Sequence, residues 1–282
     1  MITRRASFAL PLLATPALAQ GSFPSRPINI LIPFAAGGPT DMIGRLMAEG
    51  MSKDLGQTVT AENVTGAGGT IAAGRVAASR PDGYTILLHH IGLAAAATLF
   101  RQLPFSIERG LAPLGIVSHT GMTLVARPDF PANDLAGYIA QIRERGDALN
   151  LGHSGLGGSN QLCGMLLQHA AGRSATTIVF RGSAPLLTEM MAGRLDISCE
   201  QVTVAAPSVR DNRIKGYAVT LPERIPGLDL PTTREAGIDL VMSAWHGLYV
   251  AAGTPPEIQA RLSQAMRPRC ARNACASAMP RR

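Results

Sequence analysis

Residues 28–41 read INILIPFAAGGPTD. The first five residues are mostly β-branched or leucine and predict a short buried strand, which Pro33 ends. Apolar side chains then recur at helical spacing from Ile43 to Met51, and Gly56 follows as a stop signal. A strand, a glycine-rich turn and a helix in this order predict the first unit of an α/β fold.

The alternation of strand and helix patterns continues along the chain and begins again after its middle. Strand patterns lie at 58–64, 84–88, 123–126, 149–151, 177–180, 196–199 and 216–220, and helical patterns lie between them. Two such series predict two α/β lobes, each a mainly parallel sheet flanked by helices. Ligands of such sheets bind beyond the carboxyl ends of the strands. Glycine and polar residues gather there, at 33–41, 66–70, 89–92, 152–160, 181–183 and 200–203.

The two lobes are expected to be discontinuous in sequence. We assign residues 20–115 to the first lobe, 116–222 to the second, and 223–266 to a return to the first. Crossing segments are then expected near 102–122 and 220–230. Residues 267–282 contain five arginines, no acid and no apolar helical face, which is typical of a frameshifted or truncated end.

The amino terminus has the pattern of an export signal. Arg4 and Arg5 precede an apolar run, and Ala17-Leu18-Ala19 predicts cleavage before Gln20. We therefore expect residues 1–19 to be a signal peptide and the mature chain to be periplasmic. Exported proteins can form disulfides. Cys163 and Cys199 are expected to be packed thiols, and a bridge between them is the alternative.

The formal charge of +7 belongs to the two ends of the chain. Without the seven arginines at positions 1–19 and 267–282, there remain 19 basic and 19 acidic residues. A neutral body does not favour nucleic acid as a partner. The cysteine and histidine spacings match no metal pattern, so neither a metal nor a cofactor is expected.

The glycine-rich turns do not match the motifs of nucleotide binding or hydrolysis. No GxxxxGK[ST] is present, and residues 37–39 do not supply G-x-G-x-x-G. Residues 152–156 resemble a nucleophile elbow, but Leu156 stands where G-x-S-x-G needs glycine. We therefore predict no catalytic residues. A hydrolase or transferase on a two-lobed scaffold is the alternative, and an orphan sensor for a signalling partner is another.

These turns are suited to binding a small anion. Helix starts present unpaired N–H groups and the positive end of a dipole, and glycine lets an anion approach them. Thr40, Ser154 and Ser159 would add hydroxyl donors. Asp41 would cap the first helix or accept a hydrogen bond from a ligand hydroxyl or amine. The same two roles are open to Glu200. Arg181 would pair with a carboxylate or be a solvated charge.

The motifs of the chain, taken in order, match a known family. They are PSRPI at 24–28, PFAAGGPTD at 33–41, ENVTGAGG at 62–69, PDGYT at 81–85, LPF at 103–105, FRGSAP at 180–185 and AAGTPP at 251–256. The chain resembles the Bug-type periplasmic solute-binding receptors of tripartite tricarboxylate transporters over roughly residues 23–266.

The resemblance implies a type II periplasmic binding-protein fold and a non-enzymatic, monomeric receptor. Its ligand would be a small organic carboxylate, often a di- or tricarboxylate, held between the lobes and passed to membrane transporter subunits. The loop at 33–41 would grip one carboxylate, partly through ordered waters, and the loop at 152–160 would grip from the second lobe. Family members often carry small hydroxyl residues in place of His89 and His90, and Asp-Asn in place of Glu200-Gln201. The expected ligand-binding residues are Phe34, Ala35, Ala36, Gly37, Gly38, Thr40, Asp41, His90, Ser154, Gly155, Gly157, Ser159, Arg181 and Glu200.

Overall fold

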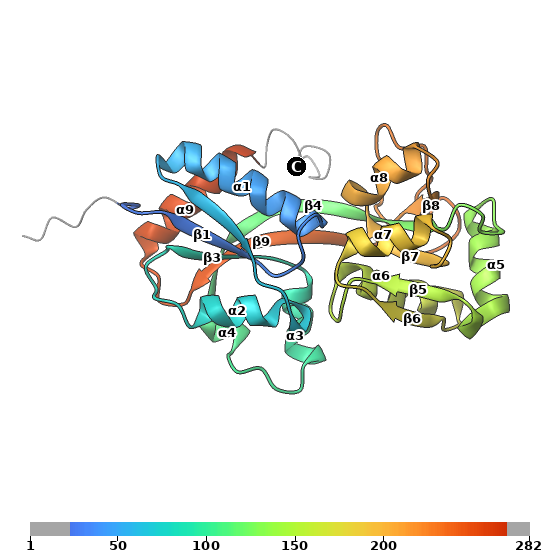
Figure 1. The fold of residues 1–282 in the computed structure, drawn as a ribbon, viewed down its shortest axis with the longest axis horizontal. Helices are drawn as coiled ribbons and strands as arrows, with labels where there is room; N and C mark the ends of the chain where they lie inside the picture. The colour runs from blue at the N-terminus through green and yellow to red at the C-terminus, as the bar shows by residue number, and fades with distance from the viewer. Residues whose placement is uncertain (1–22, 270–282) are drawn as a thin grey trace, which may run out of the picture.

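Two long strands run side by side through both halves of the molecule in the computed structural model (Figure 1). They are β4 (Leu111–Ala126) and β9 (Ser243–Ala251), and they pair antiparallel. The structure describes residues 23–269. The predicted two-lobed α/β class is confirmed, with one lobe at each end of this strand pair (Figure 1).

The first lobe is built on three parallel strands and the outer part of the β4–β9 pair. Its strands are β1 (Ile28–Ile32), β2 (Val59–Asn63) and β3 (Thr85–His90). Its helices are α1 (Pro39–Leu55), α2 (Thr70–Ala77), α3 (Gly92–Leu99), α4 (Ile107–Gly110) and α9 (Pro256–Arg269), and a 3-10 turn spans Ala67–Gly69. Ile30 packs under α1 and α9, whereas Leu31 packs under α2. Burial of both faces explains why the first strand is almost continuously apolar.

The second lobe repeats this arrangement around the other part of β4. Its strands are β5 (Asn150–His153), β6 (Thr176–Val179), β7 (Ile197–Gln201) and β8 (Lys215–Val219). Its helices are α5 (Leu135–Arg145), α6 (Ser159–Ala171), α7 (Ser183–Met191) and α8 (Val202–Arg210), and a 3-10 turn spans Gly146–Ala148. The largest core cluster of this lobe includes Phe130, Tyr138 and Leu151. Cys163 and Cys199 are buried free thiols in it, as predicted.

The connection between the lobes differs from the expectation in two ways. The linking segments are themselves strands, so the hydrogen-bonded order β2-β1-β3-β9-β4-β7-β5-β6 is continuous, with β8 on β4. Because β4, β8 and β9 run antiparallel to their neighbours, the sheet is mixed rather than mainly parallel.

The return to the first lobe also comes later than the predicted residue 223. Leu228 and Leu230 pack against Val219, and Leu240 and Met242 join the second-lobe core. The second crossing is therefore β9 rather than residues 220–230. Helix α9 reaches Arg269, three residues into the stretch that was expected to be atypical. Residues 1–19 and 270–282, which carry the predictions on the export signal and the rest of the tail, lie outside the described residues. Within residues 23–269, the helices are too short or too polar to span a membrane.

Candidate functional site

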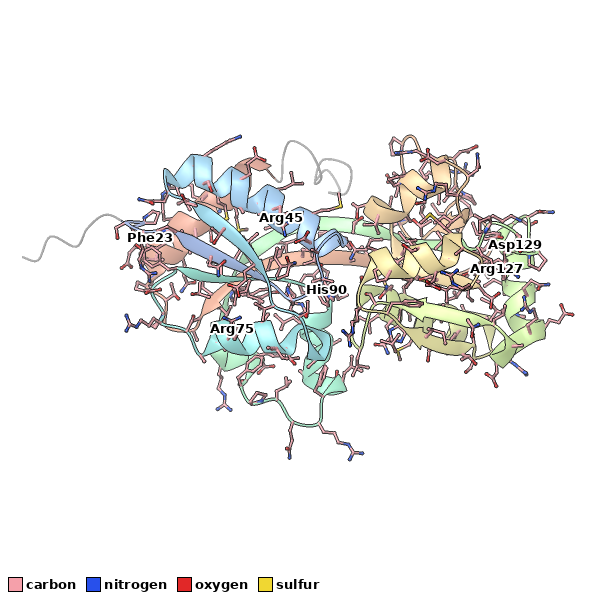
Figure 2. All side chains as sticks on the ribbon, viewed as in Figure 1. Phe23, Arg45, Arg75, His90, Arg127 and Asp129 are labelled. Carbon is pink, nitrogen blue, oxygen red and sulfur yellow. The ribbon has the colours of Figure 1, made fainter. Side chains whose placement is uncertain are left out.

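A cavity of about 20 Å³ lies where the two lobes meet. The first lobe lines it with Phe34, Ala35, Gly38, Pro39, Thr40 and His90. The second lobe lines it with Ser154, Ser159, Asn160, Gly182, Ser183, Glu200 and Gln201. Figure 2 shows His90 on the side of the first lobe that faces the second. The wall therefore combines the carboxyl ends of strands from both lobes, where the sequence predicted a site.

Four helices begin at the wall of this cavity. They are α1, α6, α7 and α8, and their capping positions are Gly38, Gly158, Gly182 and Gln201. In none of the four does a side chain of the capping residue accept a hydrogen bond from the first turn. Helix α5, away from the cavity, is capped by Asp134, which accepts from Gly137 N at 2.7 Å. The cavity thus gathers four positive dipole ends that receive no side-chain cap from their capping residues. In α6, the Gln161 N–H donates to Asn160 Oδ1 at 3.0 Å.

The His90 imidazole is neutral and adopts a single tautomer. Its ring stacks on Phe34 with centroids 4.5 Å apart, and its Nδ1 accepts a hydrogen bond from Gly92 N at 2.8 Å. Burial, followed by the neighbouring His89 and His246, holds the pKa of His90 well below its usual range. Because Nδ1 is an acceptor, the ring proton lies on Nε2. His90 therefore offers the cavity wall an uncharged donor.

Two further imidazoles support this wall from behind. His246 contacts Thr40 Oγ1 through Nε2 at 3.1 Å and Ser118 Oγ through Nδ1 at 3.0 Å. His89 donates from Nδ1 to the His90 carbonyl oxygen at 3.0 Å. Burial lowers the pKa of His246 to about 3 and that of His89 to about 4. The first-lobe wall is consequently uncharged at neutral pH.

Asp41 is buried beside the cavity but faces away from it. Its carboxylate accepts hydrogen bonds from Gly37 N at 3.0 Å, Arg45 Nε at 3.0 Å and Asn63 Nδ2 at 2.9 Å. Asn63 Nδ2 also donates to the Phe34 carbonyl oxygen, so this cluster fixes the loop between β1 and α1. Burial alone would raise the pKa of Asp41, but the hydrogen bonds from Arg45, Gly37 and Asn63 outweigh it and lower the pKa.

Glu200 lies on the second-lobe wall and has no cation for a partner among residues 23–269. It is 1% exposed. Asn160 Nδ2 donates to its Oε1 at 2.9 Å, and Ser183 Oγ donates to its Oε2 at 2.7 Å. Burial raises the pKa of Glu200, and the hydrogen bonds from Ser183 and Asn160 offset part of that increase. The beginnings of α7 and α8, on either side of it, supply the nearby positive potential.

The structure brings most of the expected residues together and places the others outside the cavity wall. Phe34, Ala35, Gly38, Thr40, His90, Ser154, Ser159 and Glu200 line the cavity. Ala36 and Gly37 are exposed on the loop, Asp41 turns to Arg45, and Gly155 and Gly157 lie beside the wall. Arg181 is exposed and outside the cavity, because the chain turns at Gly182 and presents Ser183 instead.

The sequence reasoning missed Pro39, Asn160, Gly182, Ser183 and Gln201 as individual lining residues. All five lie in the polar strand-end segments at 33–41, 152–160, 181–183 and 200–203. The sequence identified these segments, but it did not show which residue of each would line the cavity.

The lobes touch through glycines next to the cavity. A Cβ atom placed on Gly92 would collide with the carbonyl oxygen of Gly157, and one on Gly68 would collide with that of Leu156. Gly157 has a φ of +74°, which favours glycine there. The loop at 152–160 therefore approaches the first lobe backbone to backbone.

Comparisons with known proteins agree with this architecture. Residues 43–279 match the family model described as tripartite tricarboxylate transporter family receptor. A UPF0065 protein encoded in the TAR-I ttuE-ttuC' intergenic region of Agrobacterium vitis is 40% identical, covering 89% of this chain and 73% of the relative.

Two solved structures are also similar. MatC (Rpa3494) from Rhodopseudomonas palustris with bound malate has a TM-score of 0.82 at 37% identity, covering 86% of this chain and 84% of that chain. The periplasmic binding protein BugD has a TM-score of 0.83 at 38% identity, covering 86% and 82%.

Proposed function

The chain belongs to the tripartite tricarboxylate transporter receptor family, and from this premise we propose that it captures a small di- or tricarboxylate between its lobes. The family consists of receptors, so the chain is a solute-binding receptor and not an enzyme. The proposal adds that the bound acid is delivered to membrane transporter subunits. It also places the mature chain, cleaved before Gln20, in the periplasm as a monomer.

The convergence of four helix starts on one cavity carries the proposal. Backbone N–H groups and dipole ends stabilise an anion without a buried cation, and no lysine or arginine lines the cavity. Thr40, Ser154 and Ser159 add hydroxyl groups, and His90 adds a neutral N–H. The malate bound to the similar MatC is a carboxylate of the expected class.

Opening and closing of the lobes follow from the size of the cavity. A volume of about 20 Å³ holds about one water molecule, which is smaller than a dicarboxylate. The lobes must therefore separate to admit the acid and close on it through contacts from both walls. Such a ligand stabilises the closed form by its differential contacts with the two states.

A thermal-shift screen over organic acids tests ligand capture, because a ligand that binds only the folded state raises the unfolding midpoint. Gly38→Leu serves as the blocking variant. Its backbone conformation suits any residue, with φ −83°, and a Cβ there would be 3.5 Å from Ala35 O, so the position has room for a side chain. Because Gly38 lines the cavity, we expect the leucine to obstruct it.

Ala97→Leu, exposed on α3, is the matched control. We expect a midpoint increase with at least one di- or tricarboxylate in the wild type and the control, and none in Gly38→Leu. A wild-type chain that no carboxylate stabilises would refute the proposal. Delivery is tested separately, by uptake of the labelled acid in cells with and without the receptor.

A further inference from the structure

We propose that Glu200 and Gln201 form an acceptor pair that selects carboxylates bearing a hydroxyl or ammonium group on the carbon chain. This inference rests on the proposed carboxylate-binding function and names the ligand class within it. The observation behind it is a contradiction in the cavity wall: a site suited to anions also holds a buried carboxyl group and an unpaired carbonyl oxygen.

The Glu200 carboxylate is fixed in place by donors rather than by a cation. Asn160 Oδ1 accepts from Ser154 N at 3.1 Å and from Gln161 N at 3.0 Å, so the amide must direct Nδ2 at Glu200. Ser183 Oγ holds the other carboxylate oxygen at 2.7 Å. These donors orient the carboxylate but leave lone pairs on it for a further donor.

Ser198 does not complete this set. Its hydroxyl lies 2.9 Å from the Gly152 carbonyl oxygen, which can only accept, and 3.4 Å from Glu200 Oε1. The single hydroxyl proton is therefore directed at Gly152. Glu200, which lines the cavity, therefore keeps acceptor capacity for a further donor.

Gln201 supplies an independent second observation. Its side chain lines the cavity and is 2% exposed, and its Nε2 donates to Ser159 Oγ at 3.1 Å. Its Oε1 is buried and has no hydrogen-bond partner within the described part of the chain. A buried acceptor without a partner costs free energy, which a donor on the ligand would recover.

Together these groups define what the ligand must offer. Its carboxylates suit the four helix starts, and a hydroxyl or ammonium group between them would donate to Glu200 or Gln201. A dicarboxylate without that group leaves Gln201 Oε1 unpaired, offers no further donor to Glu200, and places its charge near that carboxylate. Sites built around a ligand donor discriminate strongly against analogues that lack it, so we expect at least about a tenfold difference in affinity.

The test uses two matched series measured by calorimetry on the full mature chain. One series is succinate, malate and aspartate; the other is glutarate, 2-hydroxyglutarate and glutamate. We expect the hydroxy or amino member to bind at least about tenfold more tightly than the plain acid of the same length. In Glu200→Gln this preference should fall to near equality, with the largest loss for the amino acid because its ammonium group loses a charged partner.

Glu189→Gln is the control, since Glu189 lies on α7 outside the cavity wall and pairs with Arg194. It should keep the wild-type ranking, and thermal unfolding will show that both variants are folded. Equal affinity for all members of a series in the wild type would overturn the inference, as would an unchanged ranking in Glu200→Gln. In both cases carboxylate binding itself would stand. Binding of no acid at all would instead refute the proposed function.

Discussion

Asp41 in the first lobe and Glu200 in the second are both buried acids at a strand-to-helix turn, yet their surroundings are opposite. Asp41 has Arg45 and two further donors, and its pKa is lowered. Glu200 has hydrogen-bond donors but no ion-pair partner among residues 23–269, and its pKa is raised. Asp41 lies outside the cavity wall, whereas Glu200 forms part of it.

The two walls therefore present different chemistry to the cavity. The first lobe uses its acid to hold the β1–α1 loop and presents neutral groups to the cavity. The second lobe places Glu200 and Gln201 in the cavity wall, and Gln201 Oε1 has no hydrogen-bond partner within the described residues. Burial without a cation is costly for stability, so Glu200 is better explained by binding than by folding.

The largest expected effect is a loss of folding stability at acidic pH, which should begin at the first-lobe wall. The unfolded chain binds protons at its histidines near pH 6.5, while folded His89 and His246 stay neutral down to about pH 4 and about pH 3. The stability that the neutral His89 and His246 contribute is therefore fully present above pH 6.5. It is lost as the pH falls from about 6.5 toward their folded-state pKa values of about 4 and about 3. The loss should total several kcal/mol.

Urea unfolding at pH 7.5, 6, 5 and 4 measures this loss, and hydrogen exchange should show β3 and β9 opening before β7. The pKa of His153 in the second lobe is also lowered, so that lobe should lose some stability at acidic pH too. It has no comparable histidine cluster among the described residues, so its loss should be smaller. Stability that does not change between pH 7 and 4 would contradict the neutral first-lobe wall.

The next effect concerns the contact that brings the walls together. Gly92→Ala places a methyl group against the Gly157 carbonyl oxygen and against the His90 ring, so it holds the lobes apart and displaces part of the first wall. We expect affinity for the best carboxylate to fall about 100-fold, as the closed state is lost. Calorimetry measures the affinity, and small-angle scattering reports whether the ligand still compacts the molecule.

Gly74→Ala on α2 is the control for this substitution, because its Cβ would be 3.3 Å from the Phe105 side chain within the first lobe. It should bind as the wild type does. Normal compaction and affinity in Gly92→Ala would show that the two walls do not need this contact to act on one ligand.

A third pair of variants compares the two acids directly. Asp41→Asn removes a charged partner from Arg45 and disturbs the bonds from Gly37 and Asn63, so it should lower the free energy of unfolding by about 2 kcal/mol. Glu200→Gln removes a buried charge that lacks a cation and should cost less than about 0.5 kcal/mol at pH 7. Urea unfolding of both variants decides, and equal losses would remove the contrast.

The fold and many of the residues that line the cavity could be predicted, because both depend on local patterns. Residues 28–41 combine a strand buried on both faces with a glycine turn and a helical face, and each part formed as expected. Thr40, Ser154 and Ser159 reached the cavity because the carboxyl ends of parallel strands meet at one edge of a sheet.

The remaining features depend on contacts between distant parts of the chain. Strands β4 and β9 pair across about 130 residues, and nothing local in either shows that they cross between lobes antiparallel. The sequence does not distinguish Leu240 and Met242 from other apolar residues, and only the structure shows that they pack in the second-lobe core. Similarly, the sequence indicated Arg181 within the segment 181–183, and only the packed turn shows that Ser183 lines the cavity instead.

The smallest expected effect is at Arg181, the one cation that the sequence offered to the second wall. Arg181 is exposed, lies outside the cavity, and makes no ion pair with Glu200 or any other described residue. Arg181→Ala should therefore change ligand affinity by less than about twofold at 0.15 M salt, as expected for a surface substitution. Calorimetry at 0.02 M and 0.15 M salt separates a direct contact with the ligand from long-range attraction, since only the latter is screened.

A small loss of affinity confined to low salt fits a solvated charge. A tenfold loss at both salt concentrations would mean that Arg181 reaches the ligand when the lobes close. The second lobe would then have a cation near Glu200, as the first lobe has Arg45 beside Asp41. The contrast between the two acids would no longer distinguish the lobes.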